Sequence, residues 1–273
     1  MPTALLSHPL FRQHEMGSSH PECPARLQAI EQQLIASGLD ARLHHYQAPA
    51  ASREAILRVH RPEYLNALEQ TAPTRGYAQL DPDTAMNAFS LQAAFHAAGA
   101  GIRSVDLIMG GEVSNAFCAV RPPGHHAEPG RAMGFCLFNN IAIAVAHALA
   151  LYGLHRVAII DFDVHHGNGT EAMFSGDERV LFCSSFQHPF YPGTRLEGAA
   201  ENILHAPLQA GGGSAEFRAA YEKRILPAVD AFAPQMIFVS AGFDAHEDET
   251  LAGLMLSDED YIWLSKEVVH LAS

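Results

Sequence analysis

The spacing of apolar residues predicts two helices. Over residues 24–37 apolar side chains recur at helical spacing, and Gly38 is a typical residue to end such a helix. The predicted apolar stripe consists of Leu27, Ile30, Leu34 and Ile35. Over residues 139–152 the chain is almost continuously apolar or small before Gly153, which predicts a second, largely buried helix.

Two short apolar runs predict strands. Residues 156–161 and 236–240 are both continuous enough for strands buried on both faces, as in a parallel sheet. Each run is followed at once by acidic and small residues, and open α/β sheets bind ligands at the carboxyl ends of their strands. We predict one α/β domain over residues 1–273, with a mostly parallel central sheet flanked by helices and an active site at the C-terminal ends of the strands.

Length and composition fit this prediction. A chain of 273 residues with 48% hydrophobic residues can bury a full core without dividing. The 30 acidic and 17 basic residues give a formal net charge of −13, which argues against binding nucleic acid by charge attraction. No stretch of about 18 apolar residues lacks a charge, and no basic region precedes the first apolar run, so we expect neither a membrane span nor a targeting segment.

Cysteine and histidine usage adds two expectations. The cysteines stand singly, without a C-x-x-C pair, at Cys23, Cys118, Cys136 and Cys183. This usage is typical of free thiols in a reducing compartment, so we expect a cytoplasmic protein. Among the 17 histidines, those outside the motifs below are expected to be ordinary surface or core residues, as for His44, His45, His147 and His205.

The first predicted strand runs into a segment rich in possible ligands, Asp161-Phe-Asp-Val-His-His-Gly-Asn-Gly169. Because side chains alternate faces in extended backbone, Asp161, Asp163 and His165 can point the same way, and two of them could hold one cation. An Asp and a His two residues apart are suitable zinc ligands. Acidic residues that merely cap the next helix would explain one aspartate but not the whole run.

A second segment, Ser240-Ala-Gly-Phe-Asp-Ala-His246, directly follows the other predicted strand. Gly242 allows a sharp turn, and Asp244 would then lie at the same edge of the sheet as Asp163 and His165. An Asp, His, Asp set leaves a coordination position open, which is the mark of a catalytic zinc site. Taken alone, Asp244 could equally cap a helix.

A third segment, Arg121-Pro-Pro-Gly-His-His126, is followed by Gly134-Phe135. Its prolines and glycine place two adjacent histidines on a loop, where they are unusual as core residues. Imidazole titrates near neutral pH, so His125 and His126 suit acid and base chemistry. Either histidine could instead be a metal ligand.

Together these motifs resemble the zinc-dependent deacetylase family, which includes histone deacetylases, acetoin-utilisation proteins and acetylpolyamine amidohydrolases. The matching segments follow in order over nearly the whole chain, at residues 20–26, 80–84, 121–126, 134–136, 139–140, 161–170, 191–193 and 241–244. The resemblance implies an arginase/deacetylase-like fold. It also implies hydrolysis of an acetylated peptide or small-molecule amide to acetate and a free amine.

The resemblance assigns roles to individual residues. The implied Zn²⁺ ligands are Asp163, His165 and Asp244. His125 and His126 would form the catalytic pair, with His126 as the main base and then acid. Asp161 would support His125, and Asn168 would support His126. A structural K⁺ would be held by oxygens around Asp161, Asp163, His165 and Ser184.

The resemblance also implies a narrow substrate tunnel, formed by Gly134, Phe135, Tyr191 and Leu251. Asp81 or Asp83 would meet the substrate backbone at the rim. An apolar rim at Leu251 favours acetyl-lysine or a small acetylated amide over an acetylpolyamine, whereas Glu249 nearby keeps the polyamine alternative open.

One functional residue of the family has no match. Family members carry a tyrosine on a glycine-rich loop after the third zinc ligand, where it stabilises the oxyanion. Here no glycine follows Gly253, and Tyr261 falls in a helix-like segment. We therefore expect the chain to lack the family's C-terminal segment, and one lost oxyanion donor costs about 3 to 4 kcal/mol. The alternative function is a catalytically impaired, zinc-containing protein that binds acetylated or acidic ligands.

Two further alternatives concern the metal. Two carboxylates and one imidazole form a fairly hard ligand set, so Fe²⁺ could replace Zn²⁺. A manganese ureohydrolase of the arginase kind would need carboxylates for two ions, but the sequence shows one compact Asp, His, Asp set. Nothing in the sequence indicates the oligomeric state.

Overall fold

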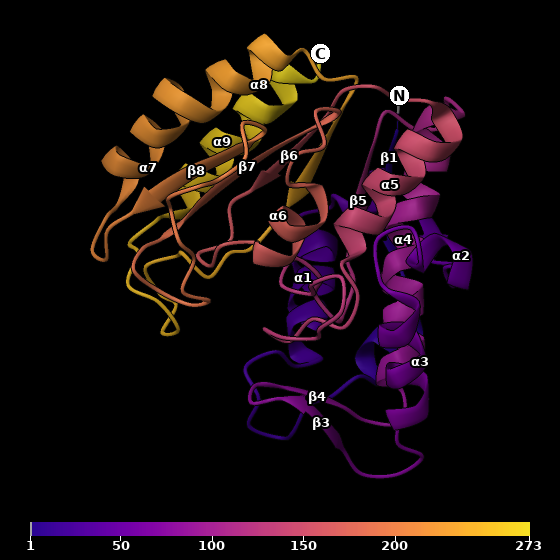
Figure 1. Cartoon of the computed structure of the whole chain (residues 1–273). Coiled ribbons are helices and arrows are strands. Elements are labelled where there is room, and N and C mark those ends of the chain that lie inside the picture. The colour runs from indigo at the N-terminus through magenta and orange to yellow at the C-terminus, as the bar shows by residue number, and fades with distance from the viewer. Residues whose placement is uncertain (1) are drawn as a thin grey trace. The chain divides into compact units, whose positions relative to one another are not determined.

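The computed structural model describes residues 2–273, which divide into two compact units (Figure 1). The first extends to Gly153, and the second runs from Leu154 to Ser273. Each unit contains a parallel sheet accompanied by helices. The predicted class, α/β with parallel sheets flanked by helices, is confirmed, whereas the extent of a single domain over residues 1–273 stays a prediction.

The first unit contains a parallel sheet of order β2-β1-β5 and an antiparallel pair of β3 and β4. Its strands are β1 (Thr3–Ser7), β2 (Leu43–Gln47), β3 (Ala78–Asp81), β4 (Thr84–Met86) and β5 (Asn115–Cys118). Its helices are α1 (Ala25–Ala36), α2 (Arg53–Ile56), α3 (Pro62–Thr71), α4 (Ser90–Met109) and α5 (Asn140–Tyr152), with short 3-10 turns η1 (Pro9–Arg12) and η2 (Asp40–Arg42).

Helices α4 and α5 pack closely because small residues face one another. A Cβ added to Gly101 would lie 2.9 Å from the Cβ of Ala144, so the two helices leave no room for a larger side chain there. The N-terminus of α5 is capped by the Asn139 side chain, which accepts a hydrogen bond from the Ala142 amide at 3.0 Å. The start of α5 is thereby fixed next to the loop that follows β5.

The second unit is built on a parallel sheet of order β8-β7-β6-β9. Its strands are β6 (Val157–Asp161), β7 (Val180–Gln187), β8 (Ile203–Leu208) and β9 (Met236–Ser240). Its helices are α6 (Asn168–Phe174), α7 (Ser214–Ala220), the π-helical turn η3 (Tyr221–Ile225), α8 (Leu226–Phe232) and α9 (Asp258–Leu271). Asp161 pairs in register with Ser184 within β7 and with Ser240 at the end of β9, so β6 and β9 end at the same level of the sheet.

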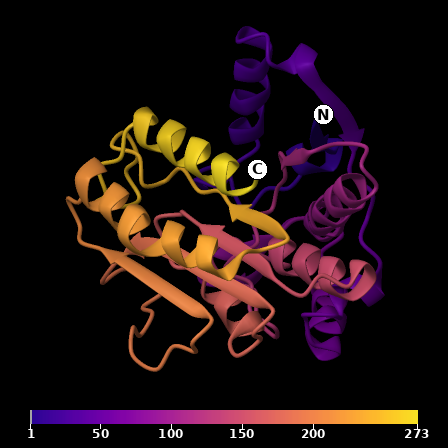
Figure 2. The ribbon, with the colours of Figure 1, turned by 90° about the horizontal axis from the view of Figure 1, so that it is seen from above.

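Helices α7 and α8 follow one another end to end through η3, and α9 runs beside them along this sheet (Figure 2). They pack with alternate residues of β6, including Ala158 and Ile160, in one apolar core. The chain turns sharply at the carboxyl ends of β6 and β9, and polar side chains gather there.

The predicted elements are found close to their expected bounds. Helix α1 ends before Gly38, whose φ is 72°, and α5 ends before Gly153, whose φ is 63°. One stripe position is wrong: Ile35 is 65% exposed, because the buried side of α1 centres on Leu27. Burial on both faces holds for β6 but is wrong for β9, where Val239 is 40% exposed, because β9 is an end strand of its sheet.

Two further expectations concern the cysteines and the presence of a membrane span. All four cysteines are free thiols, as their single placement predicts. Over residues 2–273, none of the helices combines the length and apolar composition needed to cross a bilayer.

Candidate functional site

Three of the predicted ligands come together in the second unit, at the carboxyl ends of β6 and β9. His165 Nδ1 lies 3.0 Å from Asp163 Oδ1 and 3.0 Å from Asp244 Oδ2. One ligand atom from each residue falls within 4.8 Å of the others. The structure therefore groups the Asp, His, Asp set that the two strand-end motifs predict.

Backbone hydrogen bonds to carboxylates fix this arrangement. Asp161 Oδ1 accepts from the Asp163 amide at 3.2 Å, and Asp163 Oδ1 accepts from the His165 amide at 2.8 Å. Asp244 Oδ1 accepts from the Val164 amide at 2.9 Å and so joins the two strand ends. Backbone amides thus hold the carboxylates of Asp163 and Asp244 in place, a feature that commonly supports metal ligands.

Gly242 is required by the close approach of Asp163. A Cβ at position 242 would lie 2.1 Å from Asp163 Oδ2, a distance that no side chain tolerates. The turn after β9 can therefore pass over Asp163 only with glycine at this position.

The electrostatics of the group favour a bound cation. Burial, followed by the charge of Asp163, raises the pKa of Asp244. Burial alone would lower the pKa of His165, but hydrogen bonds to Asp163 and Asp244 raise it to about 10. Two close, partly buried carboxylates thus demand positive charge, which a divalent ion supplies. The donor set fits the metal that the sequence motifs imply.

Aromatic rings surround His165. The Phe190 ring stacks on it with centroids 5.3 Å apart, and the Tyr191 ring meets it edge-on at 5.9 Å. Tyr191 is a predicted substrate contact, whereas Phe190 was not expected. In the sequence Phe190 stands directly before Tyr191, but no spacing rule indicates that its ring also contacts His165.

The two adjacent histidines lie in the first unit, on the loop between β5 and α5. His125 and His126 are both buried, with ring centroids 4.0 Å apart. The Gly124 backbone lies against the first residue of α5, because an added Cβ would lie 2.6 Å from the Asn140 amide nitrogen. The Asn140 side chain also donates to the Pro122 carbonyl at 3.1 Å. The start of α5 therefore holds the Pro-Pro-Gly turn.

Gly134 and Phe135 form a strained turn against His126. Gly134 has φ of 55°, and a Cβ there would lie 2.3 Å from His126 Cδ2. Phe135 has φ of 69°, unusual for a residue with a side chain. The Gly134 amide donates to Asp83 Oδ1 at 3.1 Å, and the Phe135 amide donates to the Thr84 hydroxyl at 2.9 Å. Asp83 thus anchors this turn within the first unit.

A buried ion pair braces the same loop from its beginning. The Arg121 guanidinium is 1% exposed and donates to both oxygens of Glu22, at 2.5 and 2.6 Å. It also donates to the Phe11 and His14 carbonyls, at 2.6 and 3.0 Å. Burial alone would raise the pKa of Glu22, but hydrogen bonds to His14 and Arg121 lower it to about 2. Arg121 and Glu22 stood in the sequence motifs without an assigned role.

The other predicted site residues occupy distinct places in the second unit. Asp161 and Ser184 are fully buried neighbours on β6 and β7, and Asn168 is the first residue of α6. Leu251 is exposed on the loop after Asp244. The roles assigned to these residues from the resemblance stay predictions.

A family model described as the histone deacetylase domain matches residues 20–273, which run through both units. The chain belongs to the histone deacetylase family. A histone deacetylase-like amidohydrolase of Pseudomonas aeruginosa is 38% identical over 252 residues, which cover 90% of this chain and 66% of that protein. A probable deacetylase of Archaeoglobus fulgidus is 36% identical over 283 residues, covering 100% of this chain and 77% of that protein.

Two further relatives extend the comparison. Human polyamine deacetylase HDAC10 is 37% identical over 274 residues, covering 90% of this chain and 40% of that protein. The crystal structure of the HDA15 HD domain matches with a TM-score of 0.93 and 34% identity, covering 99% of this chain and 80% of that one. Members of the histone deacetylase family are named as deacetylases and amidohydrolases, so the chain is a hydrolase of this class.

Proposed function

We propose that the chain is a zinc-dependent deacetylase that hydrolyses an acetylated amine, such as acetyl-lysine, to acetate and the free amine. The observation that carries this proposal is the convergence of Asp163, His165 and Asp244 on one position. These residues would hold Zn²⁺, with Fe²⁺ as the alternative for a ligand set of this hardness. Membership of the histone deacetylase family supports the reaction class.

Zinc bound there would be a Lewis acid for the acetyl carbonyl and would lower the pKa of the attacking water. His126 would take a proton from that water and later give one to the departing amine. His125 would assist as the second member of the pair. The Asp161 carboxylate would accept a hydrogen bond from His125, and the Asn168 side chain would form one with His126, so that these partners set the charge state of each ring. The burial of both rings and the close cover of His126 by Gly134 support these roles.

We also propose a structural K⁺ beside the zinc position. Its oxygen ligands would come from the segments around Asp161, Asp163, His165 and Ser184. Among the described residues 2–273, the buried Ser184 Oγ has no hydrogen-bond partner. A buried hydroxyl without a partner is costly, and a cation beside the fully buried Asp161 would satisfy it.

The substrate stem would contact Gly134, Phe135, Tyr191 and Leu251. Glu249 is the acidic residue that leaves an acetylpolyamine possible as the substrate. Its side chain turns toward its own loop. Its Oε1 accepts hydrogen bonds from the amides of Thr250 at 2.7 Å and Leu251 at 3.2 Å. This engagement supports an acetylated peptide or small amide as substrate. The human relative is named a polyamine deacetylase.

Three general features complete the proposal. We propose that residues 1–273 act as one deacetylase-like domain. The net charge of −13 supports a protein without a nucleic-acid partner. Its free, singly placed cysteines support a cytoplasmic location.

An Asp244→Asn variant tests the observation that carries the proposal. We expect this variant to lose bound zinc and to show only background turnover of a fluorogenic acetyl-lysine peptide, because one charged ligand is gone. Asp248→Asn is the matched control, since the Asp248 side chain is 92% exposed and outside the ligand group. It should keep both properties.

Retention of zinc and turnover by Asp244→Asn would show that the ligand assignment is wrong. If the unchanged, zinc-loaded chain binds the acetylated peptide without hydrolysing it, the alternative function as a binding protein is correct instead.

A further inference from the structure

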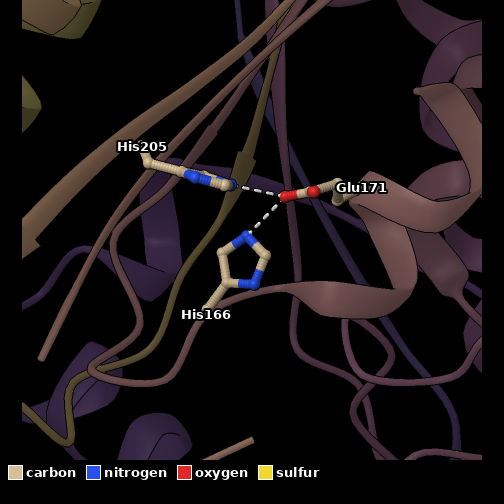
Figure 3. Close-up of side chains that lie close together, drawn as sticks. All are labelled: His166, Glu171 and His205. Atoms are coloured by element: carbon tan, nitrogen blue, oxygen red, sulfur yellow. Dashed lines mark hydrogen bonds and ion pairs between the residues drawn. The ribbon is translucent and has the colours of Figure 1, made fainter. Parts of the chain in front are cut away.

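A second group of ligand side chains lies in the second unit and shares no residue with the proposed zinc site. It consists of His166 after β6, Glu171 in α6 and His205 in β8 (Figure 3). Glu171 Oε2 lies 2.9 Å from His166 Nε2 and 2.6 Å from His205 Nε2. The sequence predicts an ordinary role for His205, because no motif links it to Glu171, 34 residues earlier. The fold brings the two together.

Burial makes this group more than a surface ion pair. His166 is 1% exposed and His205 is 8% exposed. The Phe186 ring packs against both imidazoles, with centroids 4.6 Å from His166 and 5.6 Å from His205. A carboxylate held between two rings beside this apolar wall requires nearby positive charge.

The hydrogen bonding of the histidines is incomplete without a further group. Within the described part of the chain, residues 2–273, His166 Nε2 and His205 Nδ1 have no hydrogen-bond partner. His166 Nε2 is buried and lies 2.9 Å from Glu171 Oε2 as an ion pair. Its ring is oriented from the other side, where Nδ1 lies 2.7 Å from the Thr194 hydroxyl. Such a bond on the far nitrogen is typical of metal-ligating histidines.

The arrangement repeats that of the proposed zinc site. In both groups an imidazole nitrogen lies at ordinary hydrogen-bond distance from a carboxylate oxygen, at 3.0 Å from Asp163 and at 2.9 Å between His166 and Glu171. Ligand atoms around a tetrahedral zinc stand about 3.3 Å apart, given bonds of about 2.0 to 2.1 Å. A small outward movement of each side chain would accommodate an ion among His166, Glu171 and His205.

A pocket gives access to this group. It has a volume of about 370 Å³, and His166, Glu171 and Thr194 are among its lining residues. Two imidazoles and one carboxylate supply three ligands, and the pocket leaves room for water as a fourth.

We propose that His166, Glu171 and His205 form a second transition-metal site, which takes Zn²⁺ or an ion of similar ligand preference. Imidazole and carboxylate ligands together suit zinc, iron, cobalt and nickel rather than calcium or magnesium. An ion here ties β8 and α6 to the segment that carries His165 and Asn168. The site therefore stabilises the backbone next to the proposed catalytic zinc without belonging to it.

Metal stoichiometry tests the proposal on the full chain. The protein is stripped with a chelator, reloaded with Zn²⁺, freed of unbound metal and analysed by mass spectrometry for zinc. Since there are two ligand groups, the unchanged chain should bind two ions. The Asp163→Asn/Asp244→Asn variant and the Glu171→Gln/His205→Asn variant should each bind one, and their combination none. His155→Ala removes an exposed histidine of the same unit and should still bind two.

A second measurement guards against a variant that fails to fold. Co²⁺ is titrated into the Asp163→Asn/Asp244→Asn chain, with circular dichroism as the folding check. The visible absorption of Co²⁺ with nitrogen ligands should appear and should disappear on further substitution of His205→Asn alone.

The two proposals fail in different ways. If Asp163→Asn/Asp244→Asn binds no metal and Glu171→Gln/His205→Asn binds as much as the unchanged chain, the second site does not exist and the catalytic zinc site stands. If only Glu171→Gln/His205→Asn loses metal, the second site stands and the catalytic zinc site is wrong.

Discussion

At the level of single residues, the positions of two proposed functional side chains depend on glycines, where a Cβ is absent. Gly242 allows the chain after β9 to lie against Asp163, and Gly134 allows the backbone to lie against His126. In both places the missing Cβ sets the position of a reactive side chain. A single methyl group is therefore enough to displace a ligand or a base.

Replacing Gly242 with alanine should weaken zinc binding. The added methyl group would displace Asp163, and misplaced ligands commonly cost about 10- to 100-fold in metal affinity. Competition with a zinc-sensitive chelator dye measures the effect. Gly130→Ala is the matched control, because its Cβ would meet only ordinary contacts, at 3.5 Å from the Arg61 side chain. Equal zinc affinity in the Gly242→Ala and unchanged chains would contradict the geometry described here.

At the scale of elements, the loop between β5 and α5 is held at both of its ends. Asn140 at the start of α5 fixes Pro122, and the buried pair of Arg121 and Glu22 anchors the first residue of the motif. Breaking one partner of such a buried pair leaves an uncompensated charge, which costs about 3 to 5 kcal/mol. The histidine pair thus sits on a loop that is costly to deform.

The Glu22 carboxyl should make the stability of the chain depend on pH. Its pKa falls from 4.5 to about 2 on folding, so its contribution is fully present above pH 4.5 and is lost as the pH drops toward 2. Two to three pKa units correspond to roughly 3 kcal/mol. Glu22→Gln should lose this amount of stability at pH 5 and show a flatter decline in acid, measured by urea unfolding between pH 5 and pH 2.5.

Glu69→Gln is the control for this measurement. Glu69 pairs with Arg53 at the surface, so its loss should cost about 1 kcal/mol or less. An unchanged acid dependence in Glu22→Gln would show that the buried pair does not control stability in this range.

At the level of the whole molecule, the features set by local sequence patterns could be predicted, whereas the contacts between residues far apart in the chain could not. The elements α1, α5, β6 and β9 and the Asp163, His165 and Asp244 group follow from periodicity and from the rule that sites lie at strand ends. The exposure of β9 could not be predicted, because it depends on strand order. The meeting of His205 with Glu171 depends on the pairing of β7 with β8, which no local motif encodes.

Release of acetate from an acetyl-lysine peptide by the purified chain is the decisive test of a zinc-dependent deacetylase. We expect turnover with zinc bound, loss of turnover with a chelator and recovery when zinc is restored. We also expect His126→Ala to lose most turnover while keeping its zinc, because the proposed role of His126 is to move protons and not to bind metal. Turnover that survives complete removal of metal would show that the reaction does not need zinc, and loss of zinc together with activity in His126→Ala would show that His126 is a metal ligand.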